Sequence, residues 1–224
     1  MSEANEQDAG EGAARSTAPT PGQDPQRGAG KRMTRRIVVG ISGASGAIYG
    51  IRMLEALAKA KDVETHLIVS SGAKATIAYE TEWKIDDVLG LADVVHDERD
   101  LAATLASGSF LTHGMVVAPC SVRTMSQVAN SLNDNLIVRA ADVHLKERRT
   151  LVLMVRETPL HAGHLRLMHE LALMGAVILP PAPGFYHLPK TVDDLVNHSV
   201  GKALDQLGVE HALFKRWAGV PRSE

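Results

Sequence analysis

The sequence predicts one α/β domain built on a doubly wound parallel sheet with helices on both faces. Three observations support this prediction. Short apolar segments alternate with longer amphipathic ones, a glycine-rich loop joins the first pair, and polar clusters follow several apolar segments. Repeated strand–helix units form parallel sheets, and their ligands bind beyond the carboxyl ends of the strands. The polar clusters are therefore the candidate functional loops.

The chain is expected to begin with a tail that does not fold. Residues 1–33 are rich in Gly, Ala, Pro, Gln and acidic residues and contain almost nothing large and apolar. Such a segment cannot bury enough surface to offset the entropy of ordering. We expect a disordered tail over residues 1–33, with a solubilising basic edge, followed by one folded domain over residues 34–224.

Five apolar segments are expected to form the strands of the sheet. Each is short, rich in Val, Ile or Leu and bounded by turn residues, as is typical of strands buried on both faces. They are Arg36–Ser42, Thr65–Ser70, Met115–Ala118, Leu151–Val155 and Val177–Leu179.

The segments between these strands have the spacing of helices. In the first, large apolar residues recur every three or four positions, and in the last Thr191 and Asp194 have the spacing of a capping box. The expected helices are Ala47–Ala60, Gly72–Thr81, Val122–Ala129, Ala140–Arg149, His161–Met174 and one that begins at Thr191.

Composition excludes several classes of protein. The 224 residues are 45% hydrophobic and 22% charged with a net charge of −2, so general binding to nucleic acid or to a membrane surface is not expected. The single Cys120 cannot form an internal disulfide, which suits a reducing compartment. No signal peptide or stretch long enough for a membrane helix is apparent, so a cytoplasmic location is expected.

The glycine-rich loop Gly40–Gly46 follows the first strand and opens the first helix. Free amides and the helix dipole at such a position can bind a phosphate. The loop is not a strict G-x-G-x-x-G, and Ser70 and Ser71 stand where an acidic residue would hold a ribose. The pattern favours a mononucleotide or flavin over NAD, while a tight turn with glycines for packing is the alternative.

A second loop, Ala118–Thr124, follows another apolar strand. Ser121 and Thr124 can donate hydrogen bonds to a ligand at the start of the next helix. Cys120 invites an interpretation as a nucleophile, but a thiol directly after a buried strand is usually a small hydrophobic residue.

A third cluster is the densest in charge. Arg139 and Lys146 lie seven residues apart, about two helical turns, so both can point the same way. Arg156 and Glu157 follow the next strand directly. Cations beside a carboxylate suit an anionic substrate whose reaction needs a proton acceptor. For Arg156 and Glu157 a structural ion pair is the alternative, and Arg148 and Arg149 are interpreted as a solvated face.

Two further observations complete the candidate site. Tyr186 ends a proline-rich loop and can stack on a ring or bind a phosphate, while Lys202 is a phosphate ligand or a solvated charge. The histidines form no pair with metal-ligand spacing, so no metal site is expected.

Taken together, these segments resemble the UbiX/Pad-type flavin prenyltransferases. GISGASGAIYG, APCSVRT, RAADVHLKERR, RETPLHAGHLRLM and GAVILPPAPGFYH occur in that family's order, and the resemblance spans about Arg36–Trp217. It implies a Rossmann-like, flavodoxin-like fold, a dodecamer and no metal. It also implies transfer of a dimethylallyl group from dimethylallyl phosphate to reduced FMN, giving prenylated FMN for a UbiD-type decarboxylase. Whether the donor is a mono- or diphosphate, and whether ubiquinone synthesis or aromatic-acid breakdown is served, stays open.

The resemblance also implies roles for individual residues. Glu157 would move protons, Glu80 matches a second active-site carboxylate, and Arg139 and Lys146 would lie close to the phosphate of the donor. Tyr186 and Lys202 would bind dimethylallyl phosphate, and Ser107 and Ser109 would line the site; lysine at position 202, where some relatives have arginine, loses the bidentate fork. The residues expected to contact FMN are Gly43, Ala44, Ser45, Ser70, Ser121, Val122, Arg123, Thr124 and Arg156.

Two alternatives remain. An FMN-dependent cysteine decarboxylase of the phosphopantothenoylcysteine type has a similar fold, but Arg123 stands where its pattern has asparagine. A non-catalytic FMN carrier for a partner decarboxylase would have no need of Lys146, Arg139, Glu157 and Tyr186.

Overall fold

The computed structural model describes residues 34–217 and residue 219. The expected tail over residues 1–33 lies outside the described residues. Within the described part, no helix is long and apolar enough to cross a membrane.

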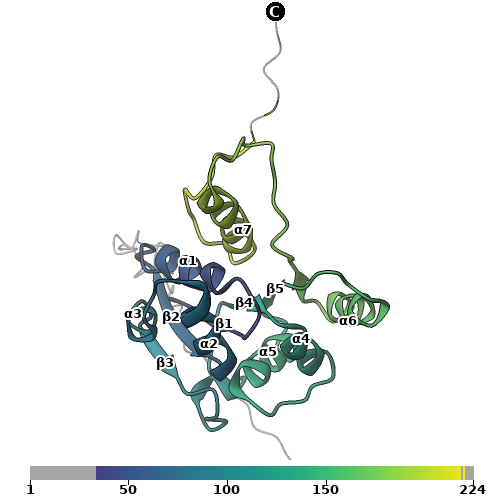
Figure 1. Cartoon of the computed structure of the whole chain (residues 1–224). Helices are drawn as coiled ribbons and strands as arrows, with labels where there is room; N and C mark the ends of the chain where they lie inside the picture. The colour runs from purple at the N-terminus through teal and green to yellow at the C-terminus, as the bar shows by residue number, and fades with distance from the viewer. Residues whose placement is uncertain (1–33, 218, 220–224) are drawn as a thin grey trace, which may run out of the picture. The chain divides into compact units, whose positions relative to one another are not determined.

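The domain is built on a parallel sheet whose six strands follow the order β3-β2-β1-β4-β5-β6 (Figure 1). This is the strand order of the Rossmann arrangement, and it confirms the expected doubly wound α/β class. The strands are β1 (Arg35–Ile41), β2 (Val63–Val69), β3 (Val94–His96), β4 (Gly114–Cys120), β5 (Thr150–Val155) and β6 (Val177–Ile178).

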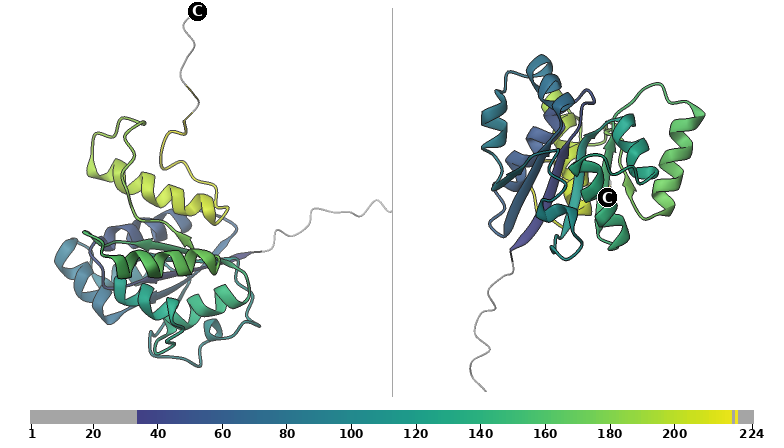
Figure 2. Two further views of the ribbon diagram at one scale, coloured as in Figure 1. Left: turned by 90° about the vertical axis from the view of Figure 1, so that its right-hand side faces the viewer. Right: turned by 90° about the horizontal axis from the view of Figure 1, so that it is seen from below.

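Helices cover both faces of the sheet, as two further views show (Figure 2). One face carries α1 (Ala47–Leu57), α2 (Ser71–Glu80), α3 (Ile85–Leu89) and α7 (Val192–Gln206), whose buried side chains share one core with the sheet. The other face carries the short 3-10 helix η1 (Thr104–Ala106), α4 (Val122–Ala129), α5 (Leu136–Lys146) and α6 (Ala162–Leu173).

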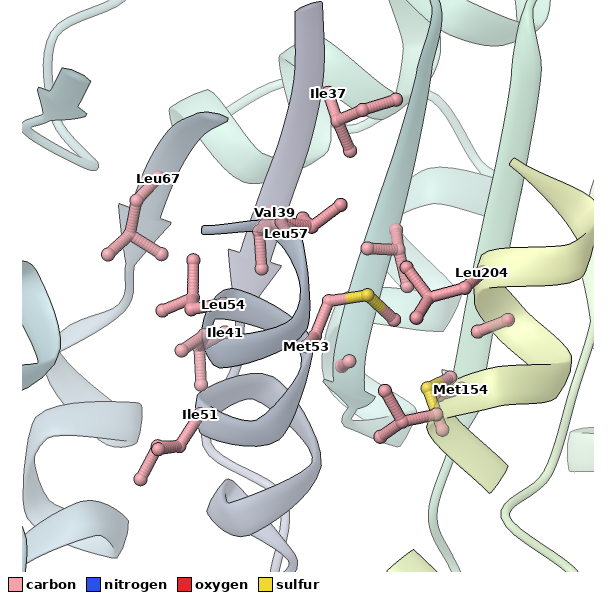
Figure 3. Packing of buried hydrophobic residues seen from close by; sticks show 14 of the residues in the cluster. Ile37, Val39, Ile41, Ile51, Met53, Leu54, Leu57, Leu67, Met154 and Leu204 are labelled. Atoms are coloured by element: carbon pink, nitrogen blue, oxygen red, sulfur yellow. The ribbon is translucent and has the colours of Figure 1, made fainter. Parts of the chain in front are cut away.

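Alternation along the strands separates the two cores. On β1, Ile37, Val39 and Ile41 face α1, whereas Val38 belongs to the core on the opposite face. Figure 3 shows the first core, in which Met53 of α1 lies between the sheet and α7. Because the Val, Leu, Ile and Met side chains in this core are almost fully removed from water, the burial of each contributes about 1.5–3 kcal/mol of hydrophobic stabilisation.

The direction of winding reverses at β1, whose two neighbours are β2 and β4. At such a reversal the loops after the two central strands diverge to opposite faces and leave a crevice at the carboxyl edge of the sheet. The loops after β1 and β4 are the glycine-rich loop and the Ser121 loop, so the topology brings both predicted motifs to one place.

Candidate functional site

A polar pocket lies at this carboxyl edge. It has a volume of about 420 Å³, within the size range of small-molecule sites. Loops after β1, β2, β3 and β4 and the start of α5 line it. The lining residues that the sequence predicted are Gly43, Ser70, Ser121, Arg123 and Thr124.

The start of α4 offers an anion site in this pocket. The Ser121 hydroxyl caps the helix by accepting a hydrogen bond from the Thr124 amide at 3.1 Å. Among the described residues, the amides of Val122 and Arg123 have no hydrogen-bond partner, and the exposed Arg123 adds a positive charge. Backbone donors, a helix dipole and a guanidinium together suit a phosphate.

The start of α1 differs from the expectation drawn from the glycine-rich loop. Here the amides are not free, because the Glu80 carboxylate accepts hydrogen bonds from Gly46 at 2.7 Å and from Ala47 at 3.3 Å. The glycines serve the turn and the packing: Gly46 has a φ of 101°, and a Cβ on Gly43 would lie 3.1 Å from the backbone of Gly72. A carboxylate of the chain thus takes the place expected for a phosphate.

A carboxylate also accepts a hydrogen bond from the first amide of α2. The Glu98 carboxylate accepts hydrogen bonds from the amide and the hydroxyl of Ser71. Of the three helix starts that follow β1, β2 and β4, only that of α4 is left for an external anion. The free amides therefore favour Ser121–Thr124 over the glycine-rich loop as the place for a phosphate.

Glu80 and Arg156 form a charged cluster beside the pocket. Burial opposes ionisation of Glu80, but hydrogen bonds from Gly46, Ser45 and Ala47 and the charge of Arg156 outweigh it and lower its pKa. Glu80 is therefore anionic at neutral pH. Arg156 follows β5, and its amide donates to the carbonyl of Cys120 at 3.1 Å. The structure thus brings Ser45, Glu80 and Arg156 together.

Glu157 is exposed and lies directly after Arg156. Its carboxylate accepts a hydrogen bond from the Thr158 amide at 3.0 Å. No ion pair joins Glu157 to Arg156 within the described part of the chain, so the structural ion pair considered as an alternative is not formed. Its carboxylate is free to meet a ligand at the carboxyl edge.

Tyr186 and Lys202 both lie next to His198 of α7. The Tyr186 hydroxyl lies 2.9 Å from Nε2 of His198, and Lys202 follows His198 by one helical turn. Lys202 is half-exposed and lies 3.8 Å from Asp205, a loose contact that leaves its ammonium able to bind an anion. The structure therefore groups the two residues expected to hold dimethylallyl phosphate.

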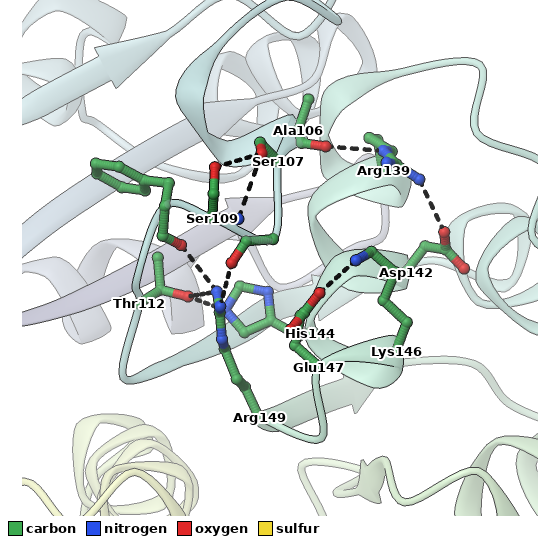
Figure 4. A network of polar contacts seen from close by, with 12 residues as sticks. Ala106, Ser107, Ser109, Thr112, Arg139, Asp142, His144, Lys146, Glu147 and Arg149 are labelled. Carbon is green, nitrogen blue, oxygen red and sulfur yellow. Dashed lines mark hydrogen bonds and ion pairs between the residues drawn. The ribbon is translucent and has the colours of Figure 1, made fainter.

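Lys146, Ser107 and Ser109 lie elsewhere in the subunit, whereas Arg139 is near the start of α5, which lines the pocket. α5 runs antiparallel to the strands, so its last residue Lys146 reaches the amino edge of the sheet, just before β5 begins. Figure 4 shows this region: Lys146 pairs with Glu147, and the hydroxyls of the two serines lie 2.8 Å apart. Lys146 is therefore separated from Glu157 by the length of β5.

Arg139 and Arg149 have structural partners in the same network. Arg139 donates to the carbonyl of Ala106 at 3.0 Å and pairs with Asp142 at 3.2 Å. Arg149 donates to the carbonyls of Gly108 and Phe110. The interpretation of Arg149 as part of a solvated face is therefore wrong: it is half-buried and fastens the loop before β4 to the start of β5.

Cys120 and the histidines take no part in a visible reactive site. Cys120 is fully buried, and burial raises the pKa of its thiol to about 12, so a thiolate does not form at neutral pH. The ring of His161 caps α6 by accepting from the Gly163 amide at 3.0 Å. Among the described residues, no group of three His, Cys, Asp or Glu side chains could hold a metal ion.

The pocket also contains residues that the sequence analysis did not select. Asn135 caps α5 by accepting from the Val138 amide at 3.1 Å. The others are Gly72, Glu98, Arg99, Gln127, Asp134 and Ile137. Glu98 and Arg99 follow the edge strand β3, so the rule that sites lie after strands would have found them had that three-residue strand been recognised.

A parallel sheet with a polar anion pocket at its point of reversal defines a mononucleotide-binding α/β protein. Comparison with known proteins agrees: a sequence model described as Flavoprotein matches residues 26–203. The flavin prenyltransferase UbiX of Thauera aromatica is 63% identical over 184 residues, which cover 82% of this chain and 94% of that protein. The chain belongs to the UbiX family of flavin prenyltransferases.

Two solved structures are also similar. AnUbiX (PadA1), solved in complex with FMN and dimethylallyl pyrophosphate, is 49% identical in sequence with a TM-score of 0.81. The match covers 83% of this chain and 98% of AnUbiX. A dodecameric FMN-dependent UbiX-like decarboxylase from Escherichia coli O157:H7 has the same sequence identity and TM-score. The match covers 82% of this chain and 100% of that protein. A PPC decarboxylase shares only 16% identity with a TM-score of 0.55, a likeness of fold alone.

Proposed function

We propose that the protein transfers a dimethylallyl group from dimethylallyl phosphate to reduced FMN. The observation that carries this proposal is the pocket at the carboxyl edge. It presents a free helix start and Arg123 for a phosphate, directly beside the charged cluster of Glu80 and Arg156. The neighbour AnUbiX, solved with FMN and dimethylallyl pyrophosphate, supports the same pair of substrates.

The start of α4 is proposed to hold the phosphate of FMN. The amides of Val122 and Arg123 and the side chains of Arg123, Ser121 and Thr124 supply donors for it, and Ser70 lines the same pocket. Gly43, Ala44 and Ser45 then lie along the path from this pocket toward Arg156, where the ring of FMN is proposed to bind. Reduced FMN supplies the electron-rich ring that the allylic carbon alkylates.

Tyr186 and Lys202 are proposed to hold the phosphate of the prenyl donor. When the carbon–oxygen bond of dimethylallyl phosphate breaks, the phosphate leaves with the bonding electrons. A phenol hydroxyl and an ammonium placed beside the phosphate would stabilise the charge that develops on it. Lys202 is a point charge, so it contributes attraction without the bidentate geometry of an arginine.

Glu157 is proposed to accept a proton at its carboxylate during ring closure on the flavin. It lies exposed beyond the carboxyl end of β5, and within the described part of the chain its one hydrogen-bond partner is the amide of Thr158. Glu80 has a different role because hydrogen bonds from Gly46 and Ala47 keep it ionised. We propose that Glu80 positions Ser45 and Arg156 against the ring.

Lys146 and Arg139 are proposed to reach the site of a neighbouring subunit. Within one subunit Lys146 lies at the amino edge of the sheet and Glu157 at the carboxyl edge. A shared site reconciles this separation with the role that the family resemblance gives to Lys146. The dodecameric UbiX-like neighbour supports an oligomer of this kind, and Ser107 and Ser109 would enter the same shared site.

The product is proposed to be prenylated FMN that a UbiD-type decarboxylase receives. We further propose a cytoplasmic location, in keeping with reduced flavin as a substrate and with a single buried cysteine.

One anaerobic experiment tests the reaction. The protein is mixed with reduced FMN and either dimethylallyl phosphate or the diphosphate, and the flavin is analysed by mass spectrometry. The expected product is a flavin that carries one added five-carbon unit. Flavin that binds but stays unmodified with both donors would favour a carrier, and decarboxylation of a cysteine-containing peptide would favour the other alternative.

A further inference from the structure

His198 on α7 contacts Tyr186, the residue proposed to bind the phosphate of the prenyl donor. Its side chain is buried, with 7% exposure, and its Nε2 lies 2.9 Å from the Tyr186 hydroxyl. The ring is stacked on His187, with centroids 4.8 Å apart and planes 12° apart, and it also contacts Phe214 at 4.9 Å. Three neighbours thus fix the orientation of one imidazole.

The direction of the hydrogen bond between these two residues matters for phosphate binding. Phosphate oxygens accept hydrogen bonds, so the single proton of the Tyr186 hydroxyl must point at the phosphate when the donor is bound. The bond to His198 must then run the other way, from Nε2–H to the phenol oxygen. Nδ1 of His198 is buried and has no partner among the described residues, which suits a ring that carries its proton on Nε2.

The charged and titratable groups around the ring favour the neutral form. Burial first, and then the charges of His187 and Lys202, lower the pKa of His198. A neutral imidazole has one N–H, so placing that proton on Nε2 leaves it available to Tyr186. Chains of hydrogen bonds polarise one another, so a donor behind the phenol oxygen strengthens the hydrogen bond that the phenol donates in front.

We infer that His198 is a positioning residue for the prenyl donor: it turns the Tyr186 hydroxyl toward the phosphate and strengthens its hydrogen bond. This inference rests on the proposed function, because it requires Tyr186 to bind the donor. It adds to that function a residue that is proposed to act through Tyr186 and not by contact with either substrate.

Two variants of His198 separate its hydrogen bond from its packing. His198→Phe keeps a ring against His187 and Phe214 but removes the N–H, whereas His198→Gln keeps a donor and loses the ring. One hydrogen bond contributes about 0.5–1.5 kcal/mol, so His198→Phe is expected to raise KM for dimethylallyl phosphate by about 2- to 12-fold. The dissociation constant of FMN is expected to stay unchanged, and His198→Gln is expected to keep most of the wild-type KM.

A double-mutant cycle with Tyr186→Phe provides the decisive readout. If His198 acts through the Tyr186 hydroxyl, His198→Phe raises KM only when that hydroxyl is present and adds nothing to Tyr186→Phe. Equal effects in both backgrounds would show that His198 supports the fold and would overturn the inference, as would a wild-type KM in His198→Phe. A wild-type KM in Tyr186→Phe itself would instead overturn the proposed role of Tyr186.

Discussion

Two oppositely charged side chains lie at two different helix starts at the carboxyl edge of the sheet: Glu80 at α1 and Arg123 at α4. Glu80 satisfies the first amides of α1, and Arg123 stands at the start of α4, where the amides are available. A carboxylate at a helix start excludes a phosphate from that place by repulsion, while an arginine recruits one. In the proposed site, single residues therefore decide which of several similar helix starts binds the phosphate.

Arg123→Ala is expected to weaken FMN binding by about 10- to 100-fold, because a hydrogen bond to a charged group contributes about 1.5–3 kcal/mol. Riboflavin provides an internal control, since it has the same ring but no phosphate. Its affinity is expected to be unchanged in the variant. Arg148→Ala, which alters an exposed arginine at the opposite edge of the sheet, is the matched protein control. An equal loss for riboflavin would show that Arg123 contacts the ring and not the phosphate.

Glu157→Gln is expected to bind FMN normally and to slow turnover by about 10²- to 10⁴-fold, the range for general acid–base groups. The amide keeps the shape of the carboxylate but cannot accept the proton. Anaerobic single-turnover spectra are expected to show a partly prenylated adduct that accumulates. Tyr186→Phe is the contrasting variant and is expected to weaken donor capture with no adduct. Wild-type turnover by Glu157→Gln would assign the proton to another acceptor, such as the released phosphate.

Most helices and strands could be predicted from the sequence, including the two-residue β6, whereas the short elements β3, α3 and η1 were missed. The first helix, the Val122–Ala129 helix and the capping box of Thr191 and Asp194 are confirmed. β3 was missed because three residues give no periodicity, and because Val94 and Val95 are exposed on this edge strand. Propensity over so few residues is a weak signal, and pairing with β2 decides the structure instead.

The position of α1 on the sheet depends on Gly50. A Cβ at this residue would overlap the carbonyl oxygen of Ala118 and lie 2.8 Å from Cδ1 of Ile41, so the helix would have to move outward. Gly50→Ala is therefore expected to lower the free energy of unfolding by about 1–3 kcal/mol, although alanine favours helices. Gly90→Ala is the matched control, because the nearest atom there lies 3.4 Å away. Equal stability of the two variants in urea denaturation would contradict this close packing.

At the scale of the whole molecule, sequence spacing could not show which edge of the sheet a residue occupies. Arg139 and Lys146 share α5, which runs over Leu136–Lys146 and not over the expected Ala140–Arg149, and this helix carries Lys146 away from Glu157. The signal was present in the chain order: a motif just before a strand lies at the amino edge, and a motif just after one lies at the carboxyl edge. In contrast, the spacing of residues along one chain does not show which residues come together between neighbouring subunits.

Mixed oligomers test whether the site is shared between subunits. Glu157→Gln and Lys146→Ala are each expected to be nearly inactive alone. If each site takes these residues from different subunits, co-expression of the two variants restores both residues in about a quarter of the sites, as random mixing at a heterologous interface requires. If one subunit supplied both residues, no site in the mixture would be complete. Prenylation by the co-purified mixture, compared with a blend of the separately purified variants, therefore measures the sharing directly, and equal inactivity of both samples would contradict a site shared between subunits.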